Sequence, residues 1–325
     1  MDGSSFLTAR NTIHGIEAKS LQLYEPAMRI LLTGKNGQLG WELHRQLERD
    51  FTVIAIGRED IDFLDTKFFA SMLRQAPKLD LIVNAAAYTN VDQAEREPFV
   101  AEMVNSEATA ILATEANRRG IPMIHFSTSQ VFNGRRRTYP YRENDPPNPV
   151  SVYGWTKLEG EHRIRYILEK HWIFRLSGLY GIHHRNFFTE ILTRNRKGIA
   201  PRVADNQTIT PNWTPLVADA IVDAINQLFW GENIPWGTYH LSGGGSTTPY
   251  GFAQLICDRI NGVWDGNMPL PIPIRSQKSR VTVTRPKYSA LDPTRFNNAF
   301  RHTLPDWQEQ FLRFFGALNP KQTGH

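Results

Sequence analysis

Tyr153 and Lys157 stand four residues apart in the segment VYGWTKLEGE. On a helix this spacing places both side chains on one face, one turn apart. A phenol titrates near ~10 and is a weak acid or base at neutral pH, but a neighbouring ammonium group favours the phenolate and lowers the phenol pKa. The pair therefore predicts proton transfer by Tyr153, with Lys157 lowering the tyrosine pKa.

Thr128 would complete this candidate catalytic set. It ends the apolar run IPMIHFST, and its hydroxyl is suited to hydrogen-bond a substrate oxygen. A tyrosine and a lysine at this spacing also occur by chance on exposed helices, which is the alternative interpretation. A glycine-rich turn upstream and a Ser/Thr strand end favour the catalytic one.

The glycine-rich turn lies in ILLTGKNGQLGWEL, where Gly34, Gly37 and Gly40 recur every third residue. An apolar run ends here and a helical pattern begins. Glycine lets backbone N–H groups approach a pyrophosphate, and a helix N-terminus adds partial positive charge. The turn predicts a dinucleotide site, and its GxxGxxG form is typical of short-chain dehydrogenases and reductases. Three glycines alone would also suit a plain strand-to-helix turn.

The end of the next apolar run, AIGREDIDFLD, would select the nicotinamide cofactor. An acid at this place would accept from the adenosine ribose hydroxyl, whereas Arg58 is a planar cation suited to a 2′-phosphate. NADPH is therefore favoured. NADH is the second choice because Glu59 and Asp60 are adjacent and an exposed surface role suits Arg58 equally well.

The segments that must position these residues alternate between short apolar runs, typical of strands, and stretches with apolar residues at helical spacing. One segment at helical spacing, 99–120, ends on a glycine as helices tend to. Strands that are apolar on both faces and joined by helices indicate an α/β fold, a doubly wound parallel sheet of the Rossmann type. The predicted strands are the runs RILLT, FTVIAI, LDLIVNAA, IPMIHFST and HWIFRLS.

The chain divides into an extension, a cofactor domain and a smaller lobe. Residues 1–27 lack the unbroken apolar core of a signal peptide and read as an unstructured extension, with Met28 a candidate natural start. Residues 28–180 form the predicted NAD(P)-binding Rossmann domain. Residues 181–325 form mainly a C-terminal substrate lobe, from which 205–242 partly return to the first domain.

Composition sets broad limits on function. The chain has 325 residues, of which 41% are hydrophobic and 21% charged, as in globular proteins. Its 37 basic and 32 acidic residues give a net charge of +5, too little for the basic stripes of nucleic-acid binders. No apolar run is long enough for a membrane span. A single cysteine, Cys257, excludes an internal disulfide and reads as a buried side chain. A cytoplasmic enzyme is expected, without nucleic-acid or membrane partners, and a homodimer is compatible with the sequence.

Other candidate groups suggest no further chemistry. His183 and His184 have no acidic or cysteine partner at metal-ligand spacing and read as a solvated loop. No metal site is predicted, and no ligand cluster supports Mg²⁺. His125 reads as a satisfied core residue, the run 135–137 as a solvated basic loop, and Thr248 as the N-cap of a helix.

From Met28 to its C-terminus the chain resembles the dTDP-4-dehydrorhamnose reductases, a family of extended short-chain reductases. The resemblance implies NAD(P)H-dependent reduction of the 4-keto group of a nucleotide-linked 6-deoxy sugar, foremost dTDP-4-dehydro-L-rhamnose. It is carried, in the family's order, by GKNGQLGWEL, NAAAYTNVDQAE, STSQVFNG, PYRENDPPNPVSVYGWTKLEGE, RLSGLYG, DNQTITPN and RPKYSALD.

The resemblance also implies roles for individual residues. The catalytic set would be Thr128, Tyr153 and Lys157, the last also holding the nicotinamide ribose with Tyr153. The cofactor contacts would be Gly37, Gln38 and Leu39 at the pyrophosphate, Asp62 and Phe63 at the adenine, and Ala86, Ala87 and Tyr88 along the rest of the dinucleotide. They join Gly34 and Arg58, which the residue patterns above already assign to the cofactor.

The sequence departs from the family at the expected substrate site, which comprises Thr128, Ser129, Gln130 and Gly178. Where the family usually has aspartate and tyrosine after the threonine, this chain has Ser129 and Gln130, and Gly178 stands where many members have tryptophan. Ile209 and Asn212 likewise replace a usual glycine and threonine. A roomier, less acidic pocket is expected, with broader tolerance for the base and the sugar.

Two alternatives share the same fold. Sugar-nucleotide epimerases and dehydratases also use the tyrosine and lysine, but dehydratases carry an Asp–Glu pair after the strand-end threonine, and Ser129 and Gln130 cannot move protons in its place. The other is a non-catalytic NADP-binding module, like the regulatory subunit of methionine adenosyltransferase. The intact set of Thr128, Tyr153 and Lys157 argues against it, and activity decides.

Overall fold

The structure is a computed structural model that describes residues 28–135, 139–263, 268–275 and 283–318. The expectation of an unstructured extension over 1–27 therefore lies outside the described residues. So do Arg136 and Arg137 of the basic run.

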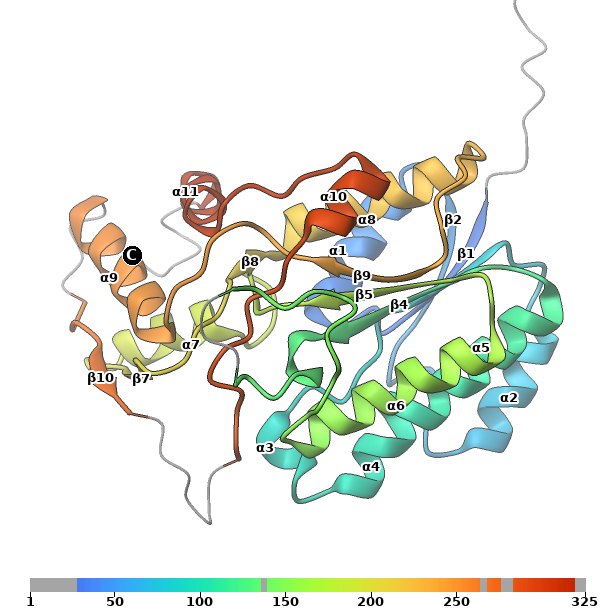
Figure 1. The fold of residues 1–325 in the computed structure, drawn as a ribbon, viewed down its shortest axis with the longest axis horizontal. Coiled ribbons are helices and arrows are strands. Elements are labelled where there is room, and N and C mark those ends of the chain that lie inside the picture. Colours follow the sequence, from blue (N-terminus) through green and yellow to red (C-terminus); the bar gives the residue numbers. More distant parts are fainter. Residues whose placement is uncertain (1–27, 136–138, 264–267, 276–282, 319–325) are drawn as a thin grey trace, which may run out of the picture.

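A six-stranded sheet in the order β2-β1-β3-β4-β5-β9 forms the centre of the molecule (Figure 1). Each neighbouring pair of strands is parallel, so the predicted doubly wound α/β fold is confirmed. The strands are β1 (Arg29–Thr33), β2 (Thr52–Ile56), β3 (Leu81–Asn84), β4 (Met123–Thr128), β5 (His171–Leu176) and β9 (Gly237–Leu241).

Helices cover both faces of the sheet (Figure 1). Ile30 and Leu32 of β1 pack into the layer formed with α1, α8 and α10, whereas Leu31 packs into the layer formed with α2, α5 and α6. Because successive side chains of a strand point to opposite faces, a strand covered on both sides is apolar at every position. The helices are α1 (Gln38–Leu47), α8 (Thr214–Phe229) and α10 (Thr294–Phe300) on one face, and α2 (Thr66–Gln75), α5 (Ala108–Arg119) and α6 (Val152–Ile167) on the other.

The strand order reverses between β1 and β3. The chain leaves β1 towards β2 on one side and later returns to β3 on the other side of β1. At such a switch point the loops that follow the two strands diverge and leave a crevice at the carboxyl edge, where open α/β sheets bind their ligands. The glycine turn follows β1, so it lies at this crevice.

A second hydrophobic core lies beyond the carboxyl edge of the sheet (Figure 1). Cys257 is buried in it, as predicted, and burial raises the pKa of its thiol to about 11. Thr248 accepts a hydrogen bond from Gly251 N at 2.9 Å, as expected of an N-cap. The elements of this region are α7 (Phe187–Asn195), α9 (Pro249–Val263), α11 (Trp307–Ala317) and the short strands β6 (Leu179–Tyr180), β7 (Arg202–Ala204), β8 (Asn212–Trp213) and β10 (Ile272–Ile274).

The predicted single helix over 99–120 is interrupted. It consists of α4 (Pro98–Glu102), a π-helical stretch over Met103–Glu107, and α5, which ends at the left-handed Gly120. Two further short helices are α3 (Val91–Ala94) and a 3₁₀ turn, η2 (Ser129–Val131). Within the described residues, no helix combines the length and the apolar character needed to cross a membrane.

Candidate active site

The glycine turn after β1 has no room for side chains. Gly34 has a φ of +77°, and a Cβ there would lie 2.6 Å from the backbone of Ala85 and Ala86 in the loop after β3. A Cβ at Gly40 would lie 2.0 Å from the carbonyl oxygen of Gly34. The spacing of the glycines is therefore a requirement of close backbone packing at the switch point.

The first turn of α1 is suited to an anion. Its N-cap, Gly37, supplies no side-chain acceptor, so the N–H groups of the first turn have no partner within the helix and are available to a pyrophosphate. Leu39 is buried in the core, which leaves only its backbone for a ligand. Gln38 donates its side-chain amide to Thr214 Oγ1 at 2.6 Å and so ties this turn to α8.

Arg58 is exposed after β2 and makes no hydrogen bond or ion pair with any residue that the structure describes. The neighbouring acids are already engaged. Lys35 Nζ lies 2.6 Å from Asp60 and 3.2 Å from Glu59, and Asn36 donates to Glu59 at 2.6 Å. These contacts lower the pKa of both acids. The Arg58 guanidinium thus remains available for a phosphate.

The other two residues expected at the adenosine follow β2. Asp62 is exposed, and its carboxylate accepts from Leu64 N at 2.9 Å. The ring of Phe63 packs against Phe69, with 4.8 Å between centroids. The structure places both residues at the carboxyl edge, near Arg58 in the chain.

The loop after β3 is held by buried polar groups. Tyr88 N donates to Asn105 Oδ1 at 2.8 Å, and the Tyr88 hydroxyl donates to Glu97 at 2.6 Å. Burial, together with Glu97, raises the pKa of Tyr88 to about 12. Ala86 and Ala87 lie between these anchors and the strand end, half-buried. The loop is therefore a fixed wall of the crevice.

Asn105 explains why the long helix is interrupted. Its side chain accepts from Tyr88 N and donates to Thr156 Oγ1 at 3.0 Å. A Cβ at Gly160 would lie 2.3 Å from the Asn105 carbonyl oxygen, so α6 packs tightly on the π-helical stretch. Such stretches are frequent at functional sites. This one joins the expected cofactor loop to the helix that carries Tyr153.

Thr128 and Tyr153 meet at the end of β4. Ser151 caps α6 by accepting from Gly154 N at 3.1 Å, which places Tyr153 in the first turn of the helix. The Tyr153 side chain lies near enough to that of Thr128 for the threonine to lower the tyrosine pKa. Burial raises the pKa of Tyr153, and Thr128 only partly opposes this.

Lys157 lies one turn further along α6 and is 1% exposed. Its Nζ lies 3.1 Å from His125 Nε2, and burial lowers the pKa of Lys157 to about 7 although Glu161 opposes the change. Burial dominates the pKa of both groups here, and Lys157 is not among the causes that shift the pKa of Tyr153. That Lys157 and a bound nicotinamide together lower the Tyr153 pKa stays a prediction.

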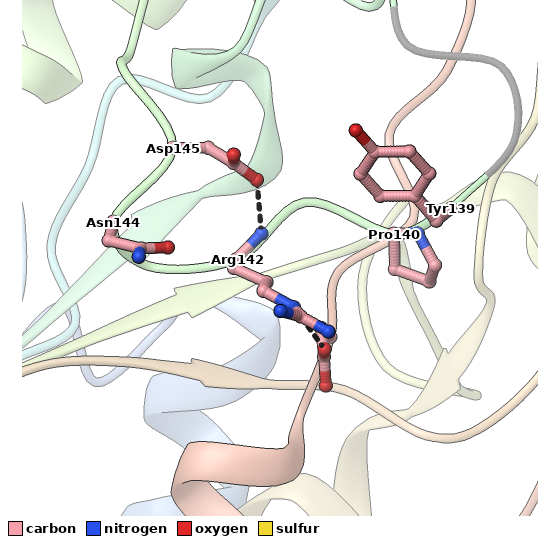
Figure 2. Close-up of a pocket in the computed structure, with 6 residues that line it drawn as sticks. Tyr139, Pro140, Arg142, Asn144 and Asp145 are labelled. Atoms are coloured by element: carbon pink, nitrogen blue, oxygen red, sulfur yellow. Dashed lines mark hydrogen bonds and ion pairs between the residues drawn. The ribbon is translucent and has the colours of Figure 1, made fainter.

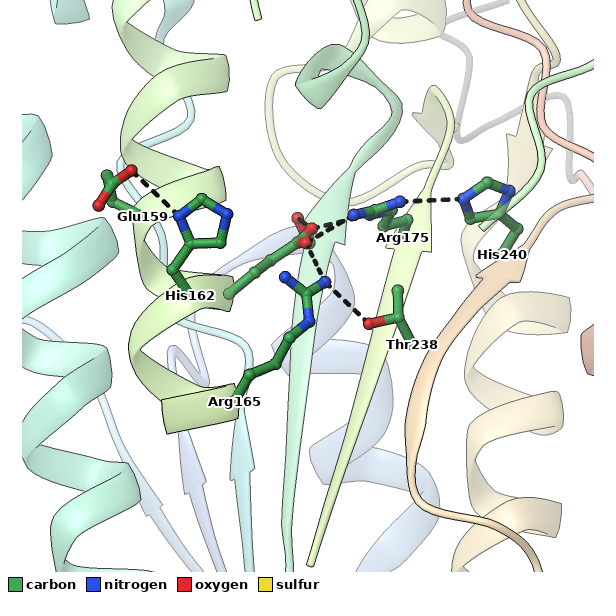
Figure 3. A network of polar contacts seen from close by, with 8 residues as sticks. Glu159, His162, Arg165, Arg175, Thr238 and His240 are labelled. Atoms are coloured by element: carbon green, nitrogen blue, oxygen red, sulfur yellow. Dashed lines mark hydrogen bonds and ion pairs between the residues drawn. The ribbon is translucent and has the colours of Figure 1, made fainter. Parts of the chain in front are cut away.

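Glu161, in the next turn of α6, anchors this region; Arg165 and Arg175, which bind it, are labelled in Figure 3. Its carboxylate accepts from Arg175 at 2.9 and 2.7 Å, from Arg165 at 2.6 Å and from Ser127 Oγ at 2.5 Å. The arginines hold the pKa of Glu161 at about 2, against the effect of burial. Arg175 also approaches His240 at 3.5 Å. The network fixes α6 against β4 and β5.

The remaining predicted substrate residues lie beside Thr128. Ser129 and Gln130 form the turn η2 directly after it. Ser129 is buried, and the buried Gln130 Oε1 has no hydrogen-bond partner among the residues that the structure describes. A Cβ at Gly178 would meet no atom within 4 Å. An unpaired acceptor and open space are features that a polar ligand could use.

The sequence interpretation missed the polar residues that support this site. Asn84, Asn105 and Glu161 are buried and hydrogen-bonded to elements distant in the chain. Their signal was the occurrence of polar residues within apolar or helical segments. His125 is a buried core residue, as predicted, but one of its partners is Lys157.

Tyr153 does not line either of two cavities in the described part of the chain. One, of about 530 Å³, is lined by Tyr139, Pro140, Arg142, Asn144, Asp145 and Asp292, and Arg142 is already paired with Asp292 at 3.2 Å (Figure 2). The other, of about 330 Å³, lies between α1, α8 and α11. His183 lines it and packs against Trp41; it is half-buried in a loop whose neighbours, His184 among them, are exposed, as the sequence predicted. Among the described residues, no group of three histidine, cysteine or acidic side chains could hold a metal ion.

Comparisons with known proteins place the chain beside nucleotide-sugar enzymes. Residues 28–319 match the family described as RmlD substrate binding domain. The dTDP-4-dehydrorhamnose reductase of Burkholderia thailandensis is 34% identical over 289 residues, 86% of this chain and 96% of that protein.

Two solved structures of that type superpose on most of the chain. The dTDP-4-dehydrorhamnose reductase of Clostridium acetobutylicum has a TM-score of 0.80 and 29% identity, covering 89% of this chain and 99% of its own. That of Bacillus anthracis, solved in complex with NADP, has a TM-score of 0.79 and 28% identity, covering 90% of this chain and 100% of its own.

Proposed function

Because the chain belongs to the RmlD substrate binding domain family, we propose that it reduces the 4-keto group of a nucleotide-linked 6-deoxy sugar. The first candidate substrate is dTDP-4-dehydro-L-rhamnose, the product dTDP-L-rhamnose. The observation that carries the proposal is the meeting of Thr128 and Tyr153 one helical turn from Lys157 at the carboxyl edge.

NADPH is the proposed cofactor. The B. anthracis relative was solved with NADP, and the residues of this chain fit the same group. The uncapped first turn of α1 suits the pyrophosphate, and the unpaired Arg58 suits a 2′-phosphate. When bound, NADPH would supply the hydride.

The proposed steps assign each side chain a proton or a hydrogen bond. Tyr153 is the general acid: its phenol is protonated at neutral pH and can donate to the sugar oxygen as negative charge develops there. Thr128 holds the same oxygen by a hydrogen bond. Lys157, one helical turn from Tyr153, would hold the nicotinamide ribose and, after taking up a proton from solvent, pass it towards Tyr153.

The two alternative functions make different demands. A dehydratase needs further catalytic residues, and a regulatory module shows no turnover. A dehydratase needs acid and base groups after Thr128, and Ser129 and Gln130 supply neither. A regulatory module would bind NADPH without oxidising it. The test is to incubate the purified protein with NADPH and dTDP-4-dehydro-L-rhamnose and to follow the nicotinamide absorbance. Oxidation that requires the sugar supports the reductase, and binding without oxidation supports the module.

The substrate range is a finer proposal that rests on Gln130, Ser129 and Gly178. Missing bulk or a missing apolar contact discriminates by only ~1 to 3 kcal/mol per group. We therefore expect the protein to reduce dTDP-4-dehydro-L-rhamnose and to tolerate a different base or a differently substituted sugar, which a panel of dTDP-, UDP- and GDP-linked 4-keto sugars compared by kcat/KM would show. A preference of several orders of magnitude for the rhamnose precursor would show that other residues restore a selective pocket.

A further inference from the structure

His125 occupies the middle of β4 with no exposed surface, and both of its ring nitrogens have partners. Nδ1 lies 3.0 Å from Asn84 Nδ2, and Nε2 lies 3.1 Å from Lys157 Nζ. A buried chain of hydrogen bonds thus runs from the loop after β3 to the lysine of the proposed site.

The contacts of Asn84 determine which atom donates and which accepts in each hydrogen bond of this series. The backbone N–H of Ala86 donates to Asn84 Oδ1 at 3.2 Å, and Thr33 Oγ1 donates to the same oxygen at 2.7 Å. The amide oxygen of Asn84 is thereby identified, because a backbone N–H can only donate. The amide nitrogen faces His125 and must donate to Nδ1.

A second contact confirms this orientation of Asn84. Its amide nitrogen also lies 3.2 Å from Thr109 Oγ1. The Thr109 hydroxyl donates to the Asn105 carbonyl oxygen at 3.0 Å, so towards Asn84 it can only accept. Both contacts of the nitrogen therefore require it to be the donor.

The proton of the histidine follows from these contacts. Nδ1 accepts, so a neutral imidazole carries its hydrogen on Nε2. Burial and the nearby lysine hold the pKa of His125 well below its usual value, which keeps the ring neutral. The Nε2–H group consequently points at Lys157 Nζ. Only an uncharged amine has a lone pair to accept it.

The surroundings of Lys157 agree with an uncharged amine. Among the described residues, the ionisable groups recorded next to it are His125 of β4 and Glu161 of α6, and Tyr153 stands one turn before it on the same helix. Glu161 is the nearby acid, but Arg175 of β5 and Arg165 of α6 already bind its carboxylate. Burial lowers the pKa of Lys157 to about 7.

We propose that His125 is a positioning residue that donates its Nε2–H to Lys157 and holds the lysine as an uncharged amine in the cofactor-free protein. The relevance to catalysis rests on the proposed function. Protonation of Lys157 would require this hydrogen bond to break, because the opposite histidine tautomer would face the amide N–H group of Asn84. The lysine is thereby kept ready to accept a proton.

The test measures the lysine directly in the cofactor-free protein. The Cε resonance of Lys157 is followed with pH in protein carrying ¹³C-labelled lysine and is assigned with Lys157→Arg. We expect the wild-type resonance to titrate near 7 and His125→Gln, whose amide can turn its oxygen to the ammonium, to raise this midpoint by at least one pH unit. His125→Asn should also raise it, because it removes the donor and retains a partner for Asn84.

The matched control is His171→Gln, which replaces another buried strand histidine whose Nδ1 bonds to the Leu168 carbonyl oxygen. It should leave the midpoint unchanged. A wild-type midpoint near the ordinary lysine value, or a midpoint that neither His125 variant moves, would overturn the proposal. If the midpoint shifts as expected but no nucleotide sugar is reduced, the proposed function fails and the role of His125 stands.

Discussion

At Tyr153 and Lys157 the same physical cause shifts the two pKa values in opposite directions. Burial disfavours the charged form of each group, so it raises the pKa of the tyrosine and lowers that of the lysine. The cofactor-free site thus contains a neutral acid and a lysine that titrates near neutrality. Both states suit a reaction in which the tyrosine gives a proton to a ketone and then recovers one.

Tyr153→Phe removes the proposed acid and little else. We expect kcat to fall by roughly 10²- to 10⁴-fold, the usual contribution of general acid–base catalysis, with NADPH affinity nearly unchanged. Steady-state kinetics and a cofactor titration measure the two quantities. Tyr166→Phe, on the exposed surface of the same helix, is the control. Turnover of Tyr153→Phe at the parental rate would refute the mechanism.

Arg58→Ala tests the choice of cofactor. The side chain has no ion pair to lose in the described protein, so its effect should be seen only on a ligand phosphate. We expect NADPH binding to weaken by roughly 1 to 3 kcal/mol, the range of a charge-assisted hydrogen bond, and NADH binding to stay unchanged. Calorimetric titration with both cofactors, with Arg49→Ala as an exposed control, distinguishes the cases. Equal losses of affinity for NADPH and NADH would show that Arg58 is an exposed surface residue that does not select the cofactor.

Sequence patterns predicted an element correctly where the residues that determine it lie close together in the chain. The glycine spacing predicted the turn because its constraint acts between Gly34 and Gly40 in one loop, and the apolar runs predicted strands because both faces are covered. The π-helical stretch was missed because its cause, the contacts of Asn105 with Tyr88 and Thr156, joins segments 17 and 51 residues away.

Gly40→Ala tests the packing of the glycine turn. The new Cβ would lie 2.0 Å from the Gly34 carbonyl oxygen, so the backbone must move, at a cost of roughly 1 to 3 kcal/mol in the free energy of unfolding. NADPH affinity should fall with it. Gly262→Ala in α9, where nothing lies within 4 Å, should instead stabilise by about 0.5 to 1 kcal/mol. Urea unfolding that shows no loss for Gly40→Ala would contradict this account.

On the scale of the whole molecule, distant segments complete both the sheet and the site. The strand β9 pairs with β5, and α8 and α10 cover the face that α1 also covers. Spacing found Tyr153 and Lys157, four residues apart, but not the chain through Asn84 and His125, 41 residues apart. Asn84 and His125 become partners because β3 and β4 are neighbours in the sheet, and a sequence period does not predict the order of strands.

Glu161 should make the stability of the whole molecule sensitive to acid. Its pKa is lowered from 4.5 to about 2 in the folded state, so its carboxylate stabilises the fold above the unfolded pKa. That contribution is lost as the pH falls from about 4.5 towards 2. Glu161→Gln should lose this dependence and, at neutral pH, about 3 to 5 kcal/mol, because Arg175 remains buried without its partner.

Urea unfolding across this pH window measures the effect of Glu161→Gln. Glu169→Gln, at an exposed position near the end of the same region, is the control and should retain the wild-type profile. An identical acid profile for wild type and Glu161→Gln would show that the buried network is not the source of the acid sensitivity.

The central claim is that the protein delivers a hydride to the keto carbon of a nucleotide sugar. The most direct measurement uses NADPH deuterated at the transferred position of the nicotinamide C4, with dTDP-4-dehydro-L-rhamnose, and locates the deuterium by NMR. We expect one deuterium at C4 of the sugar in dTDP-L-rhamnose for each NADPH oxidised, and almost none with Tyr153→Phe. NADPH oxidation without deuterium at that carbon, or cofactor binding with no reduced sugar, would contradict it.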